Sequence, residues 1–355
     1  MEDSWRRFLA PPCDDRAEPA LAGYLAGQSV LITGAGGYIG SALARAVAGA
    51  GPESLVLLDS CEYNLFQLQQ APVSGGPALH ETVLGSVLDS ALLDDILART
   101  RPGIIFHAAA YKHVPLLEYN PLAAIRNNVV GTYTLVEAIL RHGPARLIVV
   151  STDKAVEPRS IMGASKRLAE LIALSLSTPQ HAMNAVRLGN VIGSSGSVVP
   201  TFLSEIAAHQ PITLTHPEAA RYFMSLREAV EAILAAGAFP CGGRILLPEL
   251  GPPIGIKELA RYLISAAGNG PLPVRVTGLR PGEKVNEDLL FASEARTGRA
   301  GPLEVVESPA PAPSALAAMI GRLRAARSTP SLLAALAAAV PEYSPSGLLL
   351  GGDRA

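Results

Sequence analysis

The chain has 355 residues, of which 49% are hydrophobic and 17% are charged, and its formal net charge is −2. This near-neutral composition argues against a nucleic-acid-binding surface or an acidic tail, and no apolar run reaches the roughly 18 residues that a membrane span requires. Three scattered cysteines, and histidines without ligand spacing, predict a cytoplasmic protein with reduced thiols and neither a disulfide framework nor a metal site.

The first half of the chain alternates strand-like and helix-like segments. Residues 1–20 mix arginine, proline and acidic residues, so they do not resemble a signal peptide. Short apolar runs predict strands at 29–33, 54–59, 81–86, 103–109, 146–152 and 184–190, separated by helices such as 121–142 and 160–176. Continuous apolar strands that alternate with helices predict a doubly wound parallel sheet, in which ligands bind at the carboxyl ends of the strands.

A glycine-rich turn follows the first expected strand in "LITGAGGYIGSALARAV". Glycines at this spacing allow a tight turn and a close approach of the backbone to a pyrophosphate, while the amides of the next helix face the anion. The turn predicts a dinucleotide site, against the alternative of a plain glycine-rich turn. Its expected cofactor-binding residues are Gly34, Gly37, Tyr38, Ile39 and Gly40.

Further cofactor contacts are expected at the ends of the next strands. Asp59 closes the second strand, where a carboxylate binds ribose hydroxyls and disfavours a 2′-phosphate. Asp59 therefore predicts NAD as the cofactor, with NADP left open. The alternative is that Asp59 is only a solvated acid at a strand end. Ser86 and Val87 end the third strand and would lie beside adenine, and Ala108 and Ala109 complete the expected set.

Polar residues after the fourth strand are candidates for the substrate side. Lys112 and His113 would border the same crevice, where they contact either the substrate or the loop at 153–154, with a structural role equally open. Asn128 lies in the expected helix 121–142, and we expect its amide to brace the sheet or the catalytic strand.

The stretch "VVSTDKAVEPRSIMGASKR" carries the main candidates for catalysis. Asp153 and Lys154 directly follow the fifth strand, so an acid and an amine stand side by side where a ligand should lie. The alternative is a surface ion pair. Met162 and Lys166 share one face of the next helix. A thioether has no acidic proton, so Met162 cannot serve as an acid or a base.

The second half predicts a smaller substrate-binding cap. Expected boundaries are an N-terminal arm at 1–27, a dinucleotide-binding domain at 28–190 and 220–250, a cap at 191–219 and 251–300, and a partly helical C-terminal extension at 301–355. Within the extension, "SPAPAP" at 308–313 reads as a linker and 314–340 as helical. Nucleotide-binding candidates are Asn190, Arg221, Arg280 and Glu283, although either arginine could instead form a structural salt bridge.

Several long stretches together resemble one family: "AAAYKHVPLLEYNP", "NNVVGT", "RLGNVIGSSGSVVPTF", "THPEAARYFMSLREAV" and "TGLRPGEKVNEDLL", with the lysine-containing stretch above. They are similar to the extended short-chain dehydrogenases/reductases, in the group of nucleotide-sugar 4,6-dehydratases of bacterial polysaccharide biosynthesis. The resemblance covers about residues 20–345. It implies a Rossmann-type fold, NAD, a nucleotide-sugar substrate such as UDP-N-acetylglucosamine, a soluble form and a homo-oligomer. Tyr38, Ala42 and Asn286 depart from the usual pattern.

The resemblance also implies a reaction. A hydride leaves sugar carbon 4 for nicotinamide, water is eliminated across carbons 5 and 6, and the hydride returns to carbon 6. Thr152 would donate to the 4-oxygen, Asp153 would protonate the leaving 6-hydroxyl, Lys154 would take the carbon 5 proton, and Lys166 would bind the nicotinamide ribose. Met162 stands where the wider superfamily has its tyrosine base, so either the chain is inactive or its base for the first oxidation lies elsewhere. A subgroup of these dehydratases also has methionine here, and we expect Asp153 to accept the 4-hydroxyl proton, directly or through one water. A 4-epimerase, a 5,6-dehydratase and an inactive cofactor-bound scaffold remain alternatives.

Overall fold

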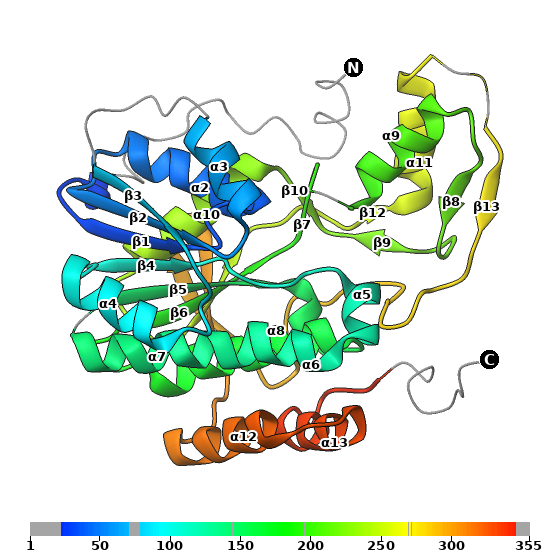
Figure 1. The fold of residues 1–355 in the computed structure, drawn as a ribbon. Helices are drawn as coiled ribbons and strands as arrows, with labels where there is room; N and C mark the ends of the chain where they lie inside the picture. Colours follow the sequence, from blue (N-terminus) through cyan, green and yellow to red (C-terminus); the bar gives the residue numbers. More distant parts are fainter. Residues whose placement is uncertain are drawn as a thin grey trace.

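The computed structural model describes residues 23–70, 79–143, 145–194, 196–268, 270 and 272–345. Most of the expected N-terminal arm, 1–27, and the last residues of the C-terminal extension therefore lie outside the described residues. Within them, a large twisted sheet carries helices on both faces, and a smaller cap stands beyond the carboxyl ends of its strands (Figure 1). The predicted α/β class with a doubly wound sheet is confirmed.

The sheet has nine strands in the order β14-β15-β11-β6-β5-β4-β1-β2-β3. The strands are β1 (Ser29–Thr33), β2 (Ser54–Asp59), β3 (Leu79–Leu84), β4 (Ile104–His107), β5 (Arg146–Thr152), β6 (Met183–Leu188), β11 (Ile245–Pro248), β14 (Ala295–Ala300) and β15 (Leu303–Glu307). All pairs from β11 to β3 are parallel. The chain order reverses between β1 and β4, so their carboxyl ends flank a crevice at the usual ligand position of such sheets.

Helices cover both faces of the sheet and close two apolar cores (Figure 1). One face carries α2 (Tyr38–Gly49), α3 (Glu62–Gln70) and α10 (Leu226–Ala238), and the other carries α4 (Ser90–Thr100), α7 (Gly131–His142) and α8 (Ile161–Leu176). A capping box of Ser225 and Glu228 fixes the start of α10. Ser160 caps α8 by accepting a hydrogen bond from the Gly163 amide at 3.0 Å. Two strong caps thus place these helices against the sheet.

The expected helix 121–142 is present but not uniform. It consists of α6 (Pro121–Ile125), a π-helical turn η3 (Arg126–Val130) and α7, and the short α5 (Val114–Tyr119) precedes it. A π-helical turn shifts the side chains that follow it and is frequent at functional sites. Here the turn carries Asn128, which reaches the loop after β4.

The C-terminal extension forms an outer layer below α6 and α8 (Figure 1). Residues 308–312 of the expected linker form neither helix nor strand, and Pro313 already begins a helix. The expected helical region divides into α12 (Pro313–Ala325) and α13 (Thr329–Ala339). Leu316, Ile320 and Leu336 are buried in the same core as α8. Consequently every residue of α8 from Ile161 to Leu174 is buried, between the sheet on one side and this layer on the other.

The cap has its own small core, which includes Phe202, Ile212 and Leu263. Its elements are β7 (Asn190–Val191), α9 (Val198–Ala207), β8 (Ile212–Leu214), β9 (Ala220–Arg221), β10 (Phe223–Met224), β12 (Ile254–Gly255), α11 (Ile256–Ala266) and β13 (Val274–Val276). Short paired strands connect this unit to the end of β6.

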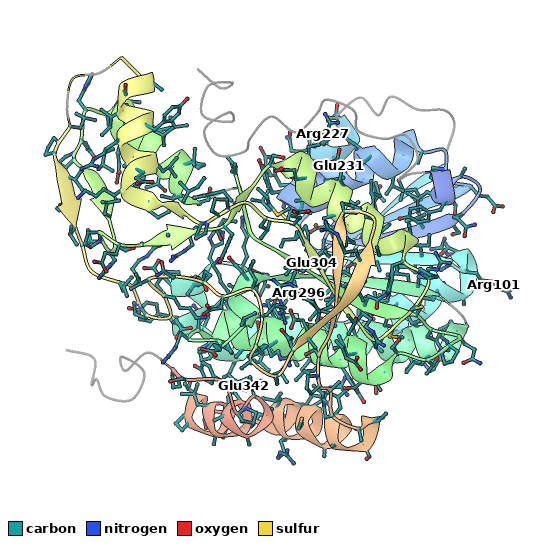
Figure 2. The ribbon with its side chains drawn as sticks, turned by 180° about the vertical axis from the view of Figure 1, so that it is seen from behind. Arg101, Arg227, Glu231, Arg296, Glu304 and Glu342 are labelled. Carbon is teal, nitrogen blue, oxygen red and sulfur yellow. The ribbon has the colours of Figure 1, made fainter. Side chains whose placement is uncertain are left out.

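Residues 295–307 differ from the expected boundaries, which placed them in the cap and the extension. The structure adds them to the sheet, because β15 pairs antiparallel with β11 and buries Leu303 and Val306. On the back of the molecule, Arg296 and Glu304 join β14 to β15 with an N–O distance of 2.6 Å (Figure 2). The hairpin thus closes one edge of an otherwise parallel sheet.

Candidate active site

A cavity of about 1340 Å³ opens between the carboxyl ends of the parallel strands and the cap. That volume exceeds the ~300–1,000 Å³ of typical small-molecule pockets, so two nucleotide-sized ligands fit in it together. Sixteen of the predicted site residues line it, namely Gly34, Gly37, Tyr38, Ile39, Gly40, Ala108, Lys112, His113, Thr152, Lys154, Met162, Lys166, Asn190, Arg221, Arg280 and Glu283. The predicted residues outside the lining are Asp59, Ser86, Val87, Ala109 and Asp153.

The glycine turn has the shape that a pyrophosphate requires. Gly34 has φ +71°, and a Cβ there would lie 2.5 Å from the Ala109 amide nitrogen. A Cβ on Gly40 would overlap the Gly34 carbonyl oxygen. Gly37 precedes α2, and within the described residues no side chain caps this helix start, so its amides stay open to an anion. The turn therefore fits a dinucleotide.

Asp59 supports this turn from the end of β2. One carboxylate oxygen accepts a hydrogen bond from the Gly36 amide and the other from the Cys61 amide, each at 2.9 Å. Ser86 accepts from the Leu88 amide, and Val87 is buried in the core. The expected contacts of these residues with ribose and adenine stay predictions.

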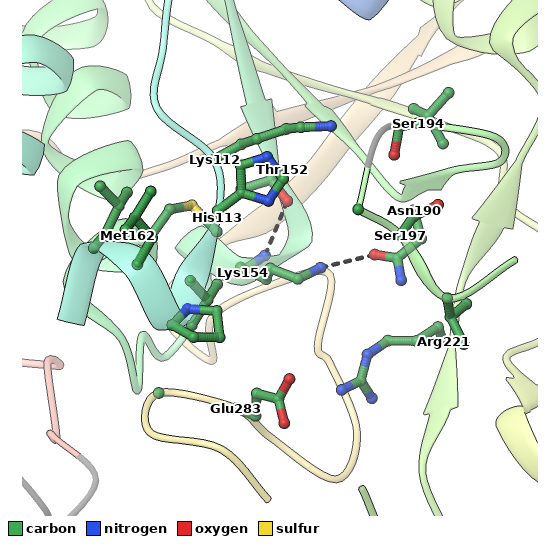
Figure 3. Close-up of a pocket in the computed structure, with 18 of the residues that line it drawn as sticks. Lys112, His113, Thr152, Lys154, Met162, Asn190, Ser194, Ser197, Arg221 and Glu283 are labelled. Atoms are coloured by element: carbon green, nitrogen blue, oxygen red, sulfur yellow. Dashed lines mark hydrogen bonds between the residues drawn. The ribbon is translucent and has the colours of Figure 1, made fainter. Parts of the chain in front are cut away.

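Thr152 and Lys154 belong to the polar wall of the cavity, and Asp153 lies between them in the chain (Figure 3). The Lys154 ammonium donates to Asp153 Oδ1 at 3.0 Å and to Asn190 Oδ1 at 2.7 Å. The Thr152 hydroxyl also donates to Asp153 Oδ1, at 2.8 Å. Asp153 is fully buried, and its Oδ2 has no hydrogen-bond partner among the described residues. Asp153 thus lies behind Thr152 and Lys154, which face the cavity in its place.

Met162 and Lys166 line the cavity from the first turns of α8, where both side chains are almost fully buried. Burial lowers the pKa of Lys166 from 10.5 to about 8, against the opposing charge of Glu170. The amine therefore loses its proton more readily than an exposed lysine does. A polar ligand that takes the place of water would stabilise its charged form. The Met162 thioether offers no proton at the position facing Thr152 and Lys154 (Figure 3).

Asn128 braces this wall as expected. Its amide oxygen accepts from the Tyr111 amide at 2.8 Å, while its Nδ2 donates to the Tyr111 carbonyl and to the Ser165 hydroxyl, each at 2.9 Å. It therefore ties the loop after β4 to α8 beside Lys166.

Lys112 and His113 stand at the opposite side of the cavity from Arg221 and Glu283 (Figure 3). Burial lowers the pKa of Lys112. Burial and the charge of Lys112 lower the pKa of His113. The His113 ring also packs near Gly196, where a Cβ would lie 2.8 Å from its Cε1. His113 can therefore contact a ligand and Gly196 at once, while Lys112 faces the cavity beside it.

Arg221 has backbone partners. Its guanidinium donates to the carbonyls of Ala220 and Val285 at 2.7 and 2.6 Å, and to the Lys284 carbonyl at 2.7 Å. Arg280 pairs with Glu283 through its Nε at 2.8 Å and through its backbone amide at 2.9 Å. Arg221 thus holds the 284–285 segment, whereas the Arg280 side chain is 59% exposed and can reorient toward a phosphate.

Sequence reasoning missed Glu287 and the Tyr38 phenol. Glu287 is buried, lines the cavity and lies 3.9 Å from the Lys154 ammonium. The Tyr38 hydroxyl donates to the Ile192 carbonyl at 2.8 Å and so connects the glycine turn to the cap. Neither contact had a local signal, because Glu287 is one of two adjacent acids in "NED" and Tyr38 was expected to contact the cofactor and not the cap.

Comparison with known proteins gives matches over most of the chain. The family model "Polysaccharide biosynthesis protein" matches residues 30–304. The capsular polysaccharide biosynthesis protein CapD of Staphylococcus aureus is 39% identical over 76% of this chain and 46% of its own length. The chain thus spans about half the length of the first curated relatives that it matches.

Other relatives carry two kinds of activity in their names. A UDP-N-acetylglucosamine 4,6-dehydratase (inverting) of Campylobacter jejuni is 32% identical, over 76% of this chain and 79% of its own. A UDP-glucose 4-epimerase of Rickettsia rickettsii is 31% identical, over 75% and 79%. The X-ray structure of Pen from Bacillus thuringiensis superposes with a TM-score of 0.73 at 26% identity, over 81% of this chain and 90% of Pen. Within the described residues, no helix combines the length and apolarity needed to cross a bilayer.

Proposed function

The chain belongs to the polysaccharide biosynthesis protein family of extended short-chain dehydrogenases/reductases, and on that premise we propose that it is a nucleotide-sugar 4,6-dehydratase. Its proposed substrate is UDP-N-acetylglucosamine, and its product is the UDP-4-keto-6-deoxy sugar. The observation that carries the proposal is the Asp153–Lys154 pair at the end of β5, connected to the cavity through Thr152 and Asn190. An acid and an amine at one sugar ring are what an elimination of water requires.

The cofactor in this proposal is NAD, held by the glycine turn and by Lys166. When bound, the nicotinamide would take up a hydride from sugar carbon 4 and return it to carbon 6. Asp59 supports NAD over NADP, because its carboxylate at the turn would repel a 2′-phosphate. Lys166 lines the cavity, and its side chain is largely removed from water, so its amine can bind the nicotinamide ribose.

The buried position of Asp153 determines how it can take part. For the first oxidation, the sugar 4-hydroxyl would give its proton to Thr152 Oγ1, while the Thr152 hydroxyl proton moves along its existing hydrogen bond to Asp153 Oδ1. This route replaces the phenol that Met162 lacks. Asp153 then holds the proton that the leaving 6-oxygen needs, and Lys154, once unprotonated, takes the proton from carbon 5.

Two measurements test the proposal. Incubation with UDP-N-acetylglucosamine should give a product lighter by one water, as read by mass spectrometry. In a single turnover, Asp153→Asn should abolish the formation of reduced nicotinamide, while Asp288→Asn, an exposed acid in another segment, should leave it unchanged. If Asp153→Asn forms reduced nicotinamide at the normal rate, Asp153 does not receive the first proton.

A 4-epimerase is the second candidate, because relatives of similar identity carry that name. It would give a product of unchanged mass and new retention time. The Asp153–Lys154 pair favours the dehydratase, since epimerisation needs no acid at carbon 6. A 5,6-dehydratase would also lose water but leave no 4-ketone, and an inactive scaffold would leave the nucleotide sugar intact. Assembly as a homo-oligomer stays a prediction, for which size-exclusion chromatography with light scattering is the test.

A further inference from the structure

We infer that Glu287 is a positioning residue, which together with Asp153 holds the Lys154 amine charged and in place until the site is filled. The inference rests on the role proposed for Lys154 and adds a residue to that site. It follows from the position of Glu287, from the way its segment is fixed, and from the charges that surround it.

The position of the Glu287 carboxylate is unusual for an acid in a loop. It lines the cavity, yet the side chain is only 3% exposed. Its Oε2 is buried and has no hydrogen-bond partner within the part of the chain that the structure describes. A buried carboxylate without full hydrogen bonding lowers the stability of the fold. Its presence at the cavity wall therefore indicates a functional role at the site.

Two cations fix the segment that carries Glu287. Arg221 donates to the carbonyls of Lys284 and Val285, and the Lys284 ammonium donates to the Val156 carbonyl at 2.8 Å. Val156 directly follows η4 (Asp153–Ala155). The segment is therefore tied both to the cap strand β9 and to the turn that carries Lys154, and these contacts place the Glu287 carboxylate.

The charges around Glu287 indicate which group it acts on. Lys154, Arg221 and Lys284 lie 3.9, 3.9 and 3.7 Å from its oxygens. Arg221 and Lys284 already donate to backbone carbonyls. Among the described residues, the partners of the Lys154 ammonium are all side chains, those of Asp153, Asn190 and Glu287. Lys154 is thus the cation whose charge depends most on Glu287.

The environment also favours the neutral form of Glu287. Burial raises its pKa, the cation Lys154 opposes this, and the Asp153 charge adds to the rise. A ligand that displaces water would strengthen the effect of burial. Protonation of Glu287 would then remove one of the two anions that stabilise the Lys154 ammonium, and so favour the free amine that the carbon 5 proton requires.

The test measures the charge state of Lys154 directly, in the full-length protein without ligand. Trace acetic anhydride acylates only unprotonated amines, and peptide mass spectrometry gives the pH at which half of Lys154 reacts. In Glu287→Gln this midpoint should fall by about one pH unit or more, because a charge within about 4 Å has been removed. Asp288→Asn is the matched control for a neighbouring acid, and Lys112 in the same samples is the internal reference, and neither should shift.

The outcomes separate this inference from the proposed function. If folded Glu287→Gln, checked by circular dichroism, titrates as the wild type does, the inference is wrong even when the wild type releases water from the nucleotide sugar. If the midpoint falls but the wild type releases no water, the inference stands and the proposed function fails. If Glu287→Gln does not fold, Glu287→Asp decides: its charge lies farther away, so a smaller fall in the same direction supports the inference and no fall overturns it.

Discussion

The buried Lys166 should lower the stability of the cofactor-free protein while it strengthens cofactor binding, and both effects can be measured. Its side chain is 6% exposed, and burial lowers its pKa from 10.5 to about 8. The unfolded chain therefore binds a proton that the folded protein partly gives up at neutral pH. By linkage, this lysine costs stability below pH 8, and the cost shrinks as the pH rises toward 10.5.

The size of the effect follows from the two pKa values. Their difference, at about 1.36 kcal/mol for each unit, makes the cost about 3 kcal/mol at pH 7. At pH 9.5 the unfolded lysine is itself partly neutral, and the cost falls to about 1.4 kcal/mol. Lys166→Met keeps a flexible chain of similar length without the charge, so it should stabilise the cofactor-free protein by these amounts.

Urea unfolding at pH 7 and pH 9.5 measures both values. Lys257→Met, at an exposed position of α11, is the matched control and should change the free energy of unfolding by less than about 0.5 kcal/mol at either pH. Lys166→Met should also bind NADH at least ten times more weakly, as measured by calorimetry. A Lys166→Met protein less stable than the wild type at pH 7 would refute the reasoning, since the amine would then be a net stabilising group.

Two further predictions concern the supports of the site. Glu170 is fully buried and pairs with Arg187 at 2.8 Å, so Glu170→Gln should cost about 3 kcal/mol or more in urea unfolding at pH 7, whereas Glu249→Gln in an exposed pair should cost less than about 1. Burial raises the pKa of Glu170 but Arg187 outweighs it, and because the net shift is downward the difference should shrink as the pH falls below 4.5. Gly40→Ala should abolish NADH binding because its Cβ would overlap the Gly34 carbonyl, while Gly321→Ala, in open space on α12, should leave binding unchanged.

The sheet and the glycine turn were predictable because their signals are local. Apolar runs of strand length and glycines at a strand end depend on neighbours within a few residues, and β1, β2 and β5 have the expected bounds. The β14–β15 hairpin was not predictable in the same way. The strand "ARTGRA" is exposed and polar, and it joins the sheet only through β15, which pairs with the edge of β11.

The candidate site divides along the same line. Thr152, Lys154, Met162 and Lys166 belong to one strand and the helix after it, so sequence spacing placed them at one wall of the cavity. The burial of Asp153 behind that wall, and the arrival of Glu287 beside Lys154, depend on contacts between distant segments. Arg221 fixes the 284–287 segment through backbone carbonyls. Because every residue has a carbonyl, such an acceptor cannot be recognised from the residue types in a sequence.

The distribution of lysine gains a physical meaning from these positions. The chain has 29 basic residues, of which five are lysine. Lys112, Lys154 and Lys166 line the cavity, and Lys284 lies 3.7 Å from Glu287, so Lys257 alone of the five stands apart from the site. Arginine keeps its charge wherever it is placed, whereas a lysine amine becomes neutral when burial is sufficient, as the lowered pKa values of Lys112 and Lys166 show. Lysine in this chain is therefore concentrated around the cavity, and at Lys112 and Lys166 burial favours the neutral amine, a form that arginine would not supply.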